Sequence, residues 1–236
     1  MIVEGSISVK AALCSNKREI AEVIFNRHKK SKDFSYIKKL CREKGIRVSE
    51  LEEAEFLKQV SGKSHGGICA RVSPRINDVF DDGDIFYLDG IEDPFNLGYM
   101  MRTLYAFGIN NILLSKRDYT LMEPQLLKSS AGAYDMANVI VAENEVEEIG
   151  AYQKKGYYLY SLYRGDDSKD IFDTRFKKKA LFMIGGEKRG ISKELLAMSD
   201  ESLHISYGNS FRNALNASGA MDTVATLLFA QRRNEK

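Results

Sequence analysis

Short apolar runs, separated by segments of helical length, dominate the chain beyond residue 84. Those with the length of a buried strand are Ile85–Leu88, Asn111–Leu114, Val139–Val141, Tyr157–Leu162, Ala180–Ile184 and Leu203–Ile205. Helical patterns lie at Leu97–Phe107, Pro124–Ser130, Glu145–Lys154, Ser192–Met198 and Ala217–Arg232. Because strands alternate with helices, we expect an α/β domain with a mainly parallel sheet.

The first 75 residues show a smaller alternation of the same kind. Expected strands are a short one containing Ile7 and Val9, then Ile20–Phe25, Ile46–Val48 and Gly67–Val72; expected helices are Val9–Cys14, Phe34–Gly45 and Glu50–Val60. In the helix at 34–45, Ile37 and Cys41 share one face, and Gly45 is placed to end it. The pattern predicts a small α/β unit.

Between these parts, residues 73–84 break the periodicity with Pro74, Gly83 and several aspartates. We therefore predict a first domain at 1–75, a linker at 76–84 and a second domain at 85–236.

Composition narrows the class of protein. Of 236 residues, 44% are hydrophobic and 29% charged, which is typical of a globular protein. No apolar run approaches the ~18–20 residues that cross a bilayer, and the N-terminus lacks signal-peptide features, so a cytoplasmic location is expected. Cys14, Cys41 and Cys69 lie far apart, which indicates buried free thiols rather than a zinc site or disulfides.

The net charge of +2 is unevenly distributed. Residues 1–75 hold 16 Lys/Arg against 9 Asp/Glu, whereas residues 76–236 hold 19 against 24. A basic first domain favours contact with a polyanion, although a solvated lysine-rich surface accounts for the charge equally well.

Three loops of the second domain could carry chemistry, since ligands of parallel sheets bind at the carboxyl ends of strands. The first, after residue 88, leads into a helix with Asn96 at its start and Arg102 in its second turn. Taken alone, Asn96 fits a helix cap and Arg102 a surface ion pair. Gly98 costs this helix about 1 kcal/mol relative to alanine, so something large could approach the backbone there.

The other two loops are rich in glycine and small residues. Gly185-Gly186-Glu187-Lys188-Arg189-Gly190 follows a strand and lets a flat ligand approach the backbone, but it matches neither a dinucleotide fingerprint nor a phosphate-binding P-loop. The last loop runs from Ile205 to Ala220 and opens the final helix with small residues. A plain turn and a tight packing contact are the structural alternatives.

Taken together, the three loops resemble a known family. Asn96-x-Gly98-x-x-x-Arg102, Gly185-Gly186-Glu187-x-x-Gly190 and Ile205 followed by Leu215-Asn216-Ala217-Ser218 stand in the order found in the SpoU family of RNA ribose 2′-O-methyltransferases, within the SPOUT superfamily. Residues 5–72, with Val9, Gly45 and the stretch at 65–68, resemble that family's substrate-binding domain.

The resemblance implies methyl transfer from S-adenosylmethionine to a ribose 2′-hydroxyl of rRNA or tRNA, without a metal. It implies a trefoil knot near the C-terminus and a homodimer whose active site draws on both chains. By this resemblance Gly185, Ile205 and Leu215 bind the cofactor, while Arg102 faces the reacting hydroxyl with Asn96, Glu187 and Asn216 around it. The residues expected to contact RNA phosphates are Lys29, Lys30, Lys32, Lys38, Lys39 and Arg42.

Two departures leave an alternative open. Ala214 stands where the family usually has serine, and Tyr207 stands where methionine is common. The missing hydroxyl favours a non-catalytic RNA-binding or assembly protein that kept the fold. Because Asn96, Arg102 and Glu187 are all present, we favour an active enzyme; nothing in the sequence separates a housekeeping role from antibiotic resistance. The glycine patterns do not fit a dehydrogenase or kinase.

Overall fold

A computed structural model describes residues 1–186, 189–211 and 213–234 of the chain. They form two compact units: the first contains residues 1–76 and 118–136, and the second contains 77–117 and 137–236. The chain therefore crosses between the units three times.

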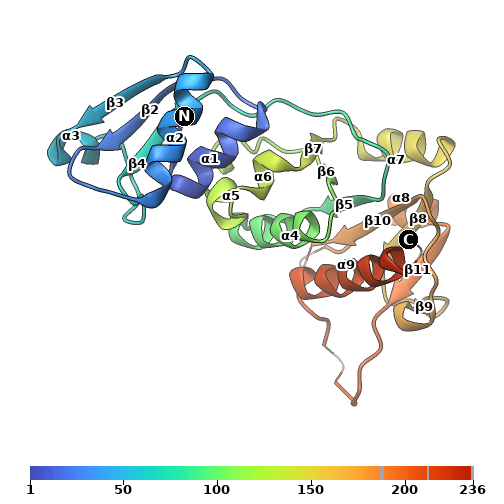
Figure 1. Ribbon diagram of the computed structural model, residues 1–236. Helices are drawn as coiled ribbons and strands as arrows, with labels where there is room; N and C mark the ends of the chain where they lie inside the picture. The colour runs from blue at the N-terminus through green and yellow to red at the C-terminus, as the bar shows by residue number, and fades with distance from the viewer. Residues whose placement is uncertain (187–188, 212, 235–236) are drawn as a thin grey trace. The chain divides into compact units, whose positions relative to one another are not determined.

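The first unit is built on a four-stranded sheet (Figure 1). Its strands are β1 (Ile2–Glu4), β2 (Ile20–Asn26), β3 (Arg47–Leu51) and β4 (Ile68–Val72), in the order β1-β4-β2-β3. β4 pairs antiparallel with both β1 and β2, while β2 and β3 are parallel. The expected small α/β unit is thus present, with a mixed sheet.

Helices of the first unit come from two parts of the chain: α1 (Ser6–Ser15), α2 (Lys32–Glu43) and α3 (Glu53–Leu57), then α5 (Glu123–Ser129) and α6 (Ala133–Met136). The strand expected at Ile7 and Val9 is wrong, because both residues lie in α1. Gly5, with φ +91°, turns the chain between β1 and that helix. Two apolar residues spaced two apart did not distinguish strand from helix.

A buried ion network joins residues 118–136 to the rest of the first unit. The Arg18 guanidinium donates to Asp135 at 2.7 Å and to Glu123 at 2.5 Å, and the side chains of Arg18 and Asp135 are fully buried. Burial alone would lower the pKa of Arg18, but its hydrogen bonds and the charges of Asp135 and Glu123 raise it, so the arginine stays charged. A buried charge is tolerated only with such partners.

The second unit contains a seven-stranded sheet in which every pairing is parallel. Its strands, in spatial order, are β7 (Asn138–Val141), β6 (Asn111–Leu114), β5 (Ile85–Asp89), β10 (Ala180–Gly185), β8 (Tyr158–Leu162), β11 (Glu201–His204) and β9 (Lys169–Asp170). The central strands are buried on both faces, which explains their continuous apolar sequences.

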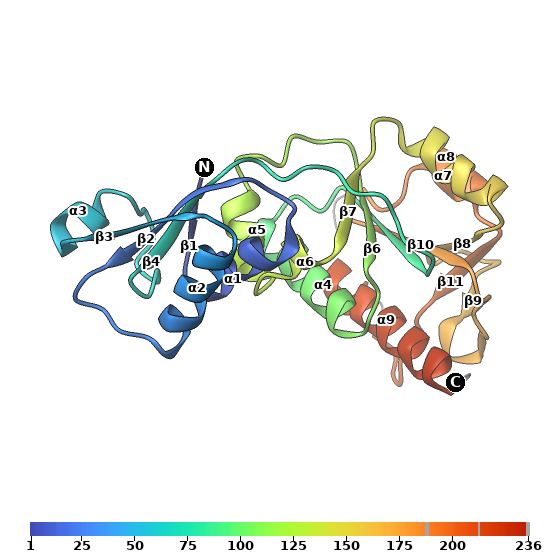
Figure 2. The same ribbon diagram turned by 45° about the horizontal axis from the view of Figure 1, so that its top comes forward.

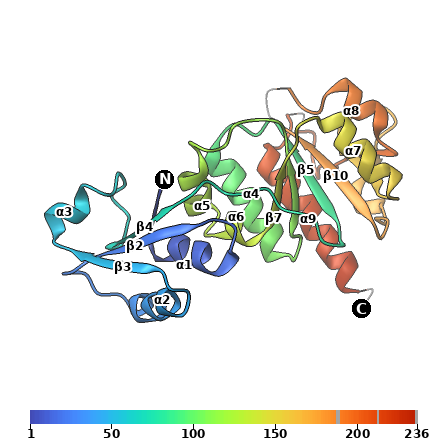
Figure 3. The same ribbon diagram turned by 90° about the horizontal axis from the view of Figure 1, so that it is seen from above.

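Helices cover both faces of this sheet, as Figures 2 and 3 show: α7 (Glu145–Lys154) and α8 (Lys193–Met198) on one, α4 (Pro94–Ala106) and α9 (Ala217–Arg233) on the other. Successive residues of one strand face opposite helix layers. Met183 packs in the cluster that contains Ile149 of α7 and Leu195 of α8. Phe182 stacks on Phe86 with ring centroids 5.0 Å apart. The predicted parallel α/β architecture is confirmed.

Two details differ from the sequence picture. The segment expected to be a linker is tied to edge strand β7, since the Asp78 carboxylate accepts from the Val139 N–H at 2.9 Å. Cys14 is exposed, so only Cys41 and Cys69 are buried thiols. Within the described ranges, no helix has the length and apolarity needed to span a bilayer.

Candidate functional site

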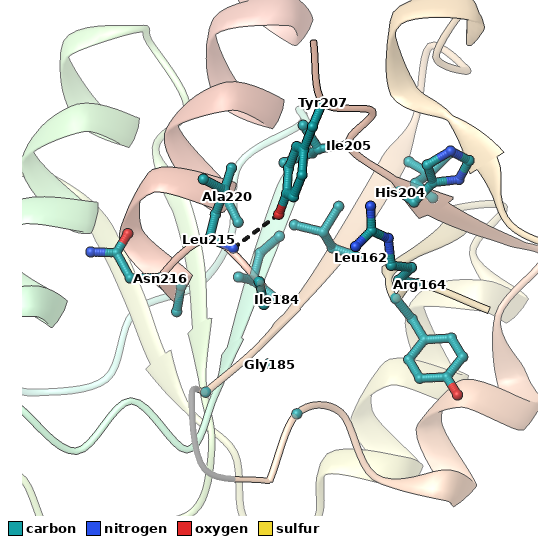
Figure 4. Close-up of a pocket in the computed structure, with 16 residues that line it drawn as sticks. Leu162, Arg164, Ile184, Gly185, His204, Ile205, Tyr207, Leu215, Asn216 and Ala220 are labelled. Carbon is teal, nitrogen blue, oxygen red and sulfur yellow. Dashed lines mark hydrogen bonds between the residues drawn. The ribbon is translucent and has the colours of Figure 1, made fainter. Parts of the chain in front are cut away.

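A cavity of about 610 Å³ opens at the carboxyl ends of the strands in the second unit (Figure 4). Its walls come from the loops after β8, β10 and β11 and from the start of α9. The described lining residues are Leu162, Tyr163, Arg164, Ile184, Gly185, Gly186, Gly190, Leu203, His204, Ile205, Tyr207, Ala214, Leu215, Asn216, Ala217 and Ala220. This volume is in the range of small-molecule sites.

All three residues expected to bind a cofactor line this cavity. Gly185 comes from the second of the three loops singled out in the sequence, and Ile205 and Leu215 come from the third. Residues far apart in sequence therefore meet because β10 and β11, the parallel strands on either side of β8, end at the same edge of the sheet. Ala214, the main departure from the family pattern, lies in the same wall.

The glycine loop after β10 is folded tightly on itself and on the loop after β5. A Cβ at Gly185 would lie 2.4 Å from the carbonyl carbon of Gly190, and one at Gly186 would lie 2.7 Å from the carbonyl oxygen of Gly90. Gly190 itself has φ +64°, which favours glycine. This wall of the cavity is therefore formed by backbone.

The entry into α9 is held by two hydrogen bonds. The Asn216 side-chain oxygen caps the helix by accepting from the Gly219 N–H at 2.8 Å. The Tyr207 hydroxyl accepts from the Leu215 N–H at 3.1 Å, the dashed line in Figure 4. The Asn216 side chain points away from Tyr207 in that view, so its visible role is to fix the wall that Leu215 belongs to.

Of the other residues expected near the reacting hydroxyl, Asn96 and Arg102 do not line the cavity. Asn96 and Arg102 lie on α4, where Arg102 is exposed and Asn96 half-buried. Asp93 caps that helix by accepting from the Asn96 N–H at 2.7 Å, so the capping role considered for Asn96 belongs to Asp93. Glu187 lies outside the described residues.

The loop after β8 was missed by motif reasoning. Next to Leu162, the last residue of β8, it contributes Tyr163 and Arg164 to the lining, and the Arg164 guanidinium lies over the Tyr207 ring, 4.9 Å from its centroid. The rule that ligands meet strand ends applies to it as well, because a strand was expected at 157–162. No known motif marked these residues.

The loop after β11 is anchored by a charged side chain. Burial alone would raise the pKa of Asp170, but hydrogen bonds from the Ser206 side chain and the Phe172 N–H outweigh it and lower that pKa. The ionised carboxylate thus holds Ser206, next to Ile205 and Tyr207 of the wall. In the described ranges, no group of three His, Cys, Asp or Glu side chains is placed to hold a metal ion.

The six side chains expected to contact RNA lie in the first unit and differ in their surroundings. Lys38 pairs with Glu50 at 2.6 Å and Lys39 with Glu43 at 3.7 Å. Lys29, Lys30, Lys32 and Arg42 are exposed, and no ion pair to another described residue is seen for them. Of this set, Lys29 and Lys30 in the loop after β2 are therefore among the side chains whose positive charge is least neutralised.

A parallel α/β unit with glycine-lined strand ends and a cavity of this size has the arrangement in which α/β proteins bind small molecules. Residues 84–226 match the SpoU rRNA Methylase family, and residues 2–77 match the RNA 2′-O ribose methyltransferase substrate binding domain. The chain belongs to the SpoU rRNA methylase family, which confirms the resemblance drawn from its motifs.

Individual relatives are similar to this protein along most of the chain. The 23S rRNA (guanosine-2′-O-)-methyltransferase RlmB of Xylella fastidiosa is 24% identical over 81% of this chain and 81% of its own. The mitochondrial rRNA methyltransferase 1 of Schizosaccharomyces pombe is 27% identical over 92% and 86%. The SpoU methyltransferase AviRb of Streptomyces viridochromogenes, solved in complex with AdoMet, has a TM-score of 0.80 at 20% identity, covering 99% and 90%.

The glycine packing gives a first testable expectation. Gly185→Ala should destabilise the second unit by about 1–3 kcal/mol, because its methyl group meets backbone that has to shift. Gly208→Ala is the matched control: its Cβ would meet nothing within 4 Å, so its effect should stay within about 0.5 kcal/mol. Urea unfolding measures both, and equal stabilities would show that the close contact does not exist.

Proposed function

We propose that this protein transfers a methyl group from S-adenosylmethionine to a ribose 2′-hydroxyl of rRNA or tRNA. The observation that carries the proposal is the single cavity in which Gly185, Ile205 and Leu215 meet. Membership of a methylase family, together with the match of residues 2–77 to a substrate-binding domain, supports the same reaction and RNA as the acceptor.

The cavity suits the cofactor in shape and chemistry. The backbone of Gly185 and Gly186 lines the cavity and would let a flat adenine ring approach closely, while Ile184, Ile205 and Leu215 supply apolar contacts. When bound, S-adenosylmethionine supplies a methyl group on a sulfonium, which is a good leaving group, so no metal is needed. At the cofactor cavity, the protein's own task is to bind the methyl donor and orient it.

At the acceptor end the chain must align a poor nucleophile and help remove its proton. Arg102 is the proposed residue for the alignment. Because a guanidinium stays protonated in proteins, we assign Arg102 a positioning role: it holds an RNA phosphate or polarises the ribose oxygen, and the released proton passes to solvent. Asn96 and Glu187 are proposed to orient Arg102, and Asn216 acts through the cap that fixes the start of α9.

We further propose a homodimer with shared active sites. Arg102 does not line the cavity of its own chain, so a second copy would have to bring its α4 there. Exposed Phe95 and Tyr99 on α4 and Phe229 on α9 supply apolar surface for such a contact. The trefoil knot that the resemblance implies near the C-terminus belongs to this proposal.

RNA binding is proposed for the domain at 1–75 and catalysis for that at 85–236, joined at 76–84, in the cytoplasm. The alternative, a non-catalytic RNA-binding protein, rests on Ala214, which removes one hydroxyl from the cavity wall. We favour the enzyme, because the family motifs otherwise persist and the curated relatives carry methyltransferase names.

Methyl transfer from labelled S-adenosylmethionine to total RNA tests the reaction. The wild-type protein should incorporate label that alkaline hydrolysis places on ribose, and Arg102→Ala should lower the rate about a hundredfold or more while cofactor binding persists. If the wild-type protein binds the cofactor but labels no RNA, the non-catalytic alternative holds.

Complementation tests the shared site. Ala217→Phe puts a ring into the cavity, and Arg102→Ala removes the acceptor-side guanidinium, so each homodimer should be inactive. A mixed dimer has one cavity intact and faces it with one intact Arg102. We expect activity to return when the two variants are co-expressed and purified through different tags. Continued inactivity of the purified mixed dimer would place Arg102 on its own chain's cavity.

Replacing Lys29, Lys30 and Lys32 with alanine tests the RNA surface. Affinity for RNA should fall, and the slope of log K against log salt should flatten by roughly 2–3, because fewer counterions are released. The matched control is the exposed triplet Lys177, Lys178 and Lys179, which precedes β10 and so lies at the opposite end of that strand from the cavity. If both triplets lower the affinity for RNA equally, the first triplet contributes only general surface charge and is not a specific RNA contact.

A further inference from the structure

One charged side chain in the cavity has no role in the proposed function so far. Arg164 follows β8 and lines the cavity, and the other described lining residues include no lysine, second arginine, aspartate or glutamate. Among the described lining residues, its guanidinium is the strongest polar feature.

The position of Arg164 is set by the wall itself. Its guanidinium lies over the Tyr207 ring, 4.9 Å from the centroid, and the Tyr207 hydroxyl is fixed by the Leu215 N–H at 3.1 Å. Figure 4 shows the Arg164 side chain reaching toward Tyr207 and His204. A cation held on an aromatic face keeps its N–H edge available for a ligand.

Nothing described in the protein neutralises this charge. No carboxylate among residues 1–186, 189–211 and 213–234 pairs with Arg164, and the nearby His204 Nδ1 is engaged with Ser168, 3.0 Å from its hydroxyl. A planar guanidinium matches a carboxylate through two parallel hydrogen bonds. The cavity is thus prepared for a small ligand that carries one anionic group.

We propose that Arg164 binds the α-carboxylate of the methionyl part of the methyl donor, and so determines which adenosine compounds the cavity accepts. The inference rests on the proposed function. The carboxylate is the only anionic group of that ligand, and a guanidinium beside the sulfonium would be repelled. An RNA phosphate is the competing partner, and the RNA-affinity measurement below distinguishes it, because the proposed dimer brings α4 of a second copy to this cavity.

The test compares two ligands that differ in the carboxylate. S-adenosylhomocysteine carries it, whereas decarboxylated S-adenosylhomocysteine has the same adenosine, thioether and amine without it. By calorimetry, Arg164→Ala should weaken binding of the first by about tenfold or more and leave the second within about twofold. Arg164→Lys should restore part of the lost affinity, because it keeps the charge but loses the fork. Arg233→Ala, an exposed change at the far end of α9, is the control and should alter neither.

Each other outcome has a definite meaning. If Arg164→Ala weakens both ligands equally, the carboxylate contact is overturned and the cofactor site stands. If both ligands bind Arg164→Ala as they bind wild type and RNA affinity falls instead, Arg164 contacts RNA. If the wild-type protein binds neither ligand, the cofactor site itself fails, and with it the proposed function. Since Arg164 is exposed, its variants should melt with the wild type, which separates binding from folding.

Discussion

The close backbone contact of Gly185 and Gly186 with Gly190 and Gly90 is the constraint on which the cavity depends. β5 and β10 are parallel neighbours, and Gly185 pairs with Asp89, so the loops that follow them leave the sheet side by side. With a Cβ at either glycine the loops would collide. The wall facing the ligand is therefore peptide backbone, which recognises shape and hydrogen-bonding edges and carries no charge of its own.

Tyr207 connects the two departures from the family pattern. Ala214 removes a hydroxyl just before Leu215, and the Tyr207 hydroxyl meets the Leu215 N–H in the same wall. One substitution thus takes a hydroxyl from this loop, and the other brings a hydroxyl to it from a different position. The same ring also supports Arg164. The Tyr207 hydroxyl thus supplies a polar contact in the same wall where the Ala214 side chain supplies none.

Sequence reasoning succeeded where one local rule decided the outcome. The buried strands β5, β6 and β10 were predicted correctly, because a strand that is buried on both faces has a short, continuous apolar sequence. It failed at Ile7 and Val9, where a short spacing fits two structures, and it did not assign α6 or β9, which are only a few residues long. Arg164 escaped because no motif marks the loop after β8. Placing residues 118–136 in the first unit required tertiary contacts that no local pattern contains.

The contacts of residues 118–136 in the first unit determine where the chain can be divided. Residues 118–136 leave the second unit to join the first, where Glu123 and Asp135 neutralise Arg18. A cut at residue 75 would remove Arg18 and leave two buried carboxylates without their cation, a loss that costs several kcal/mol in comparable pairs. The segments that match the two family models therefore share a core, because residues 118–136 of the methylase match pack in the first unit. In sequence they look like two modules, but as folding units they are interleaved.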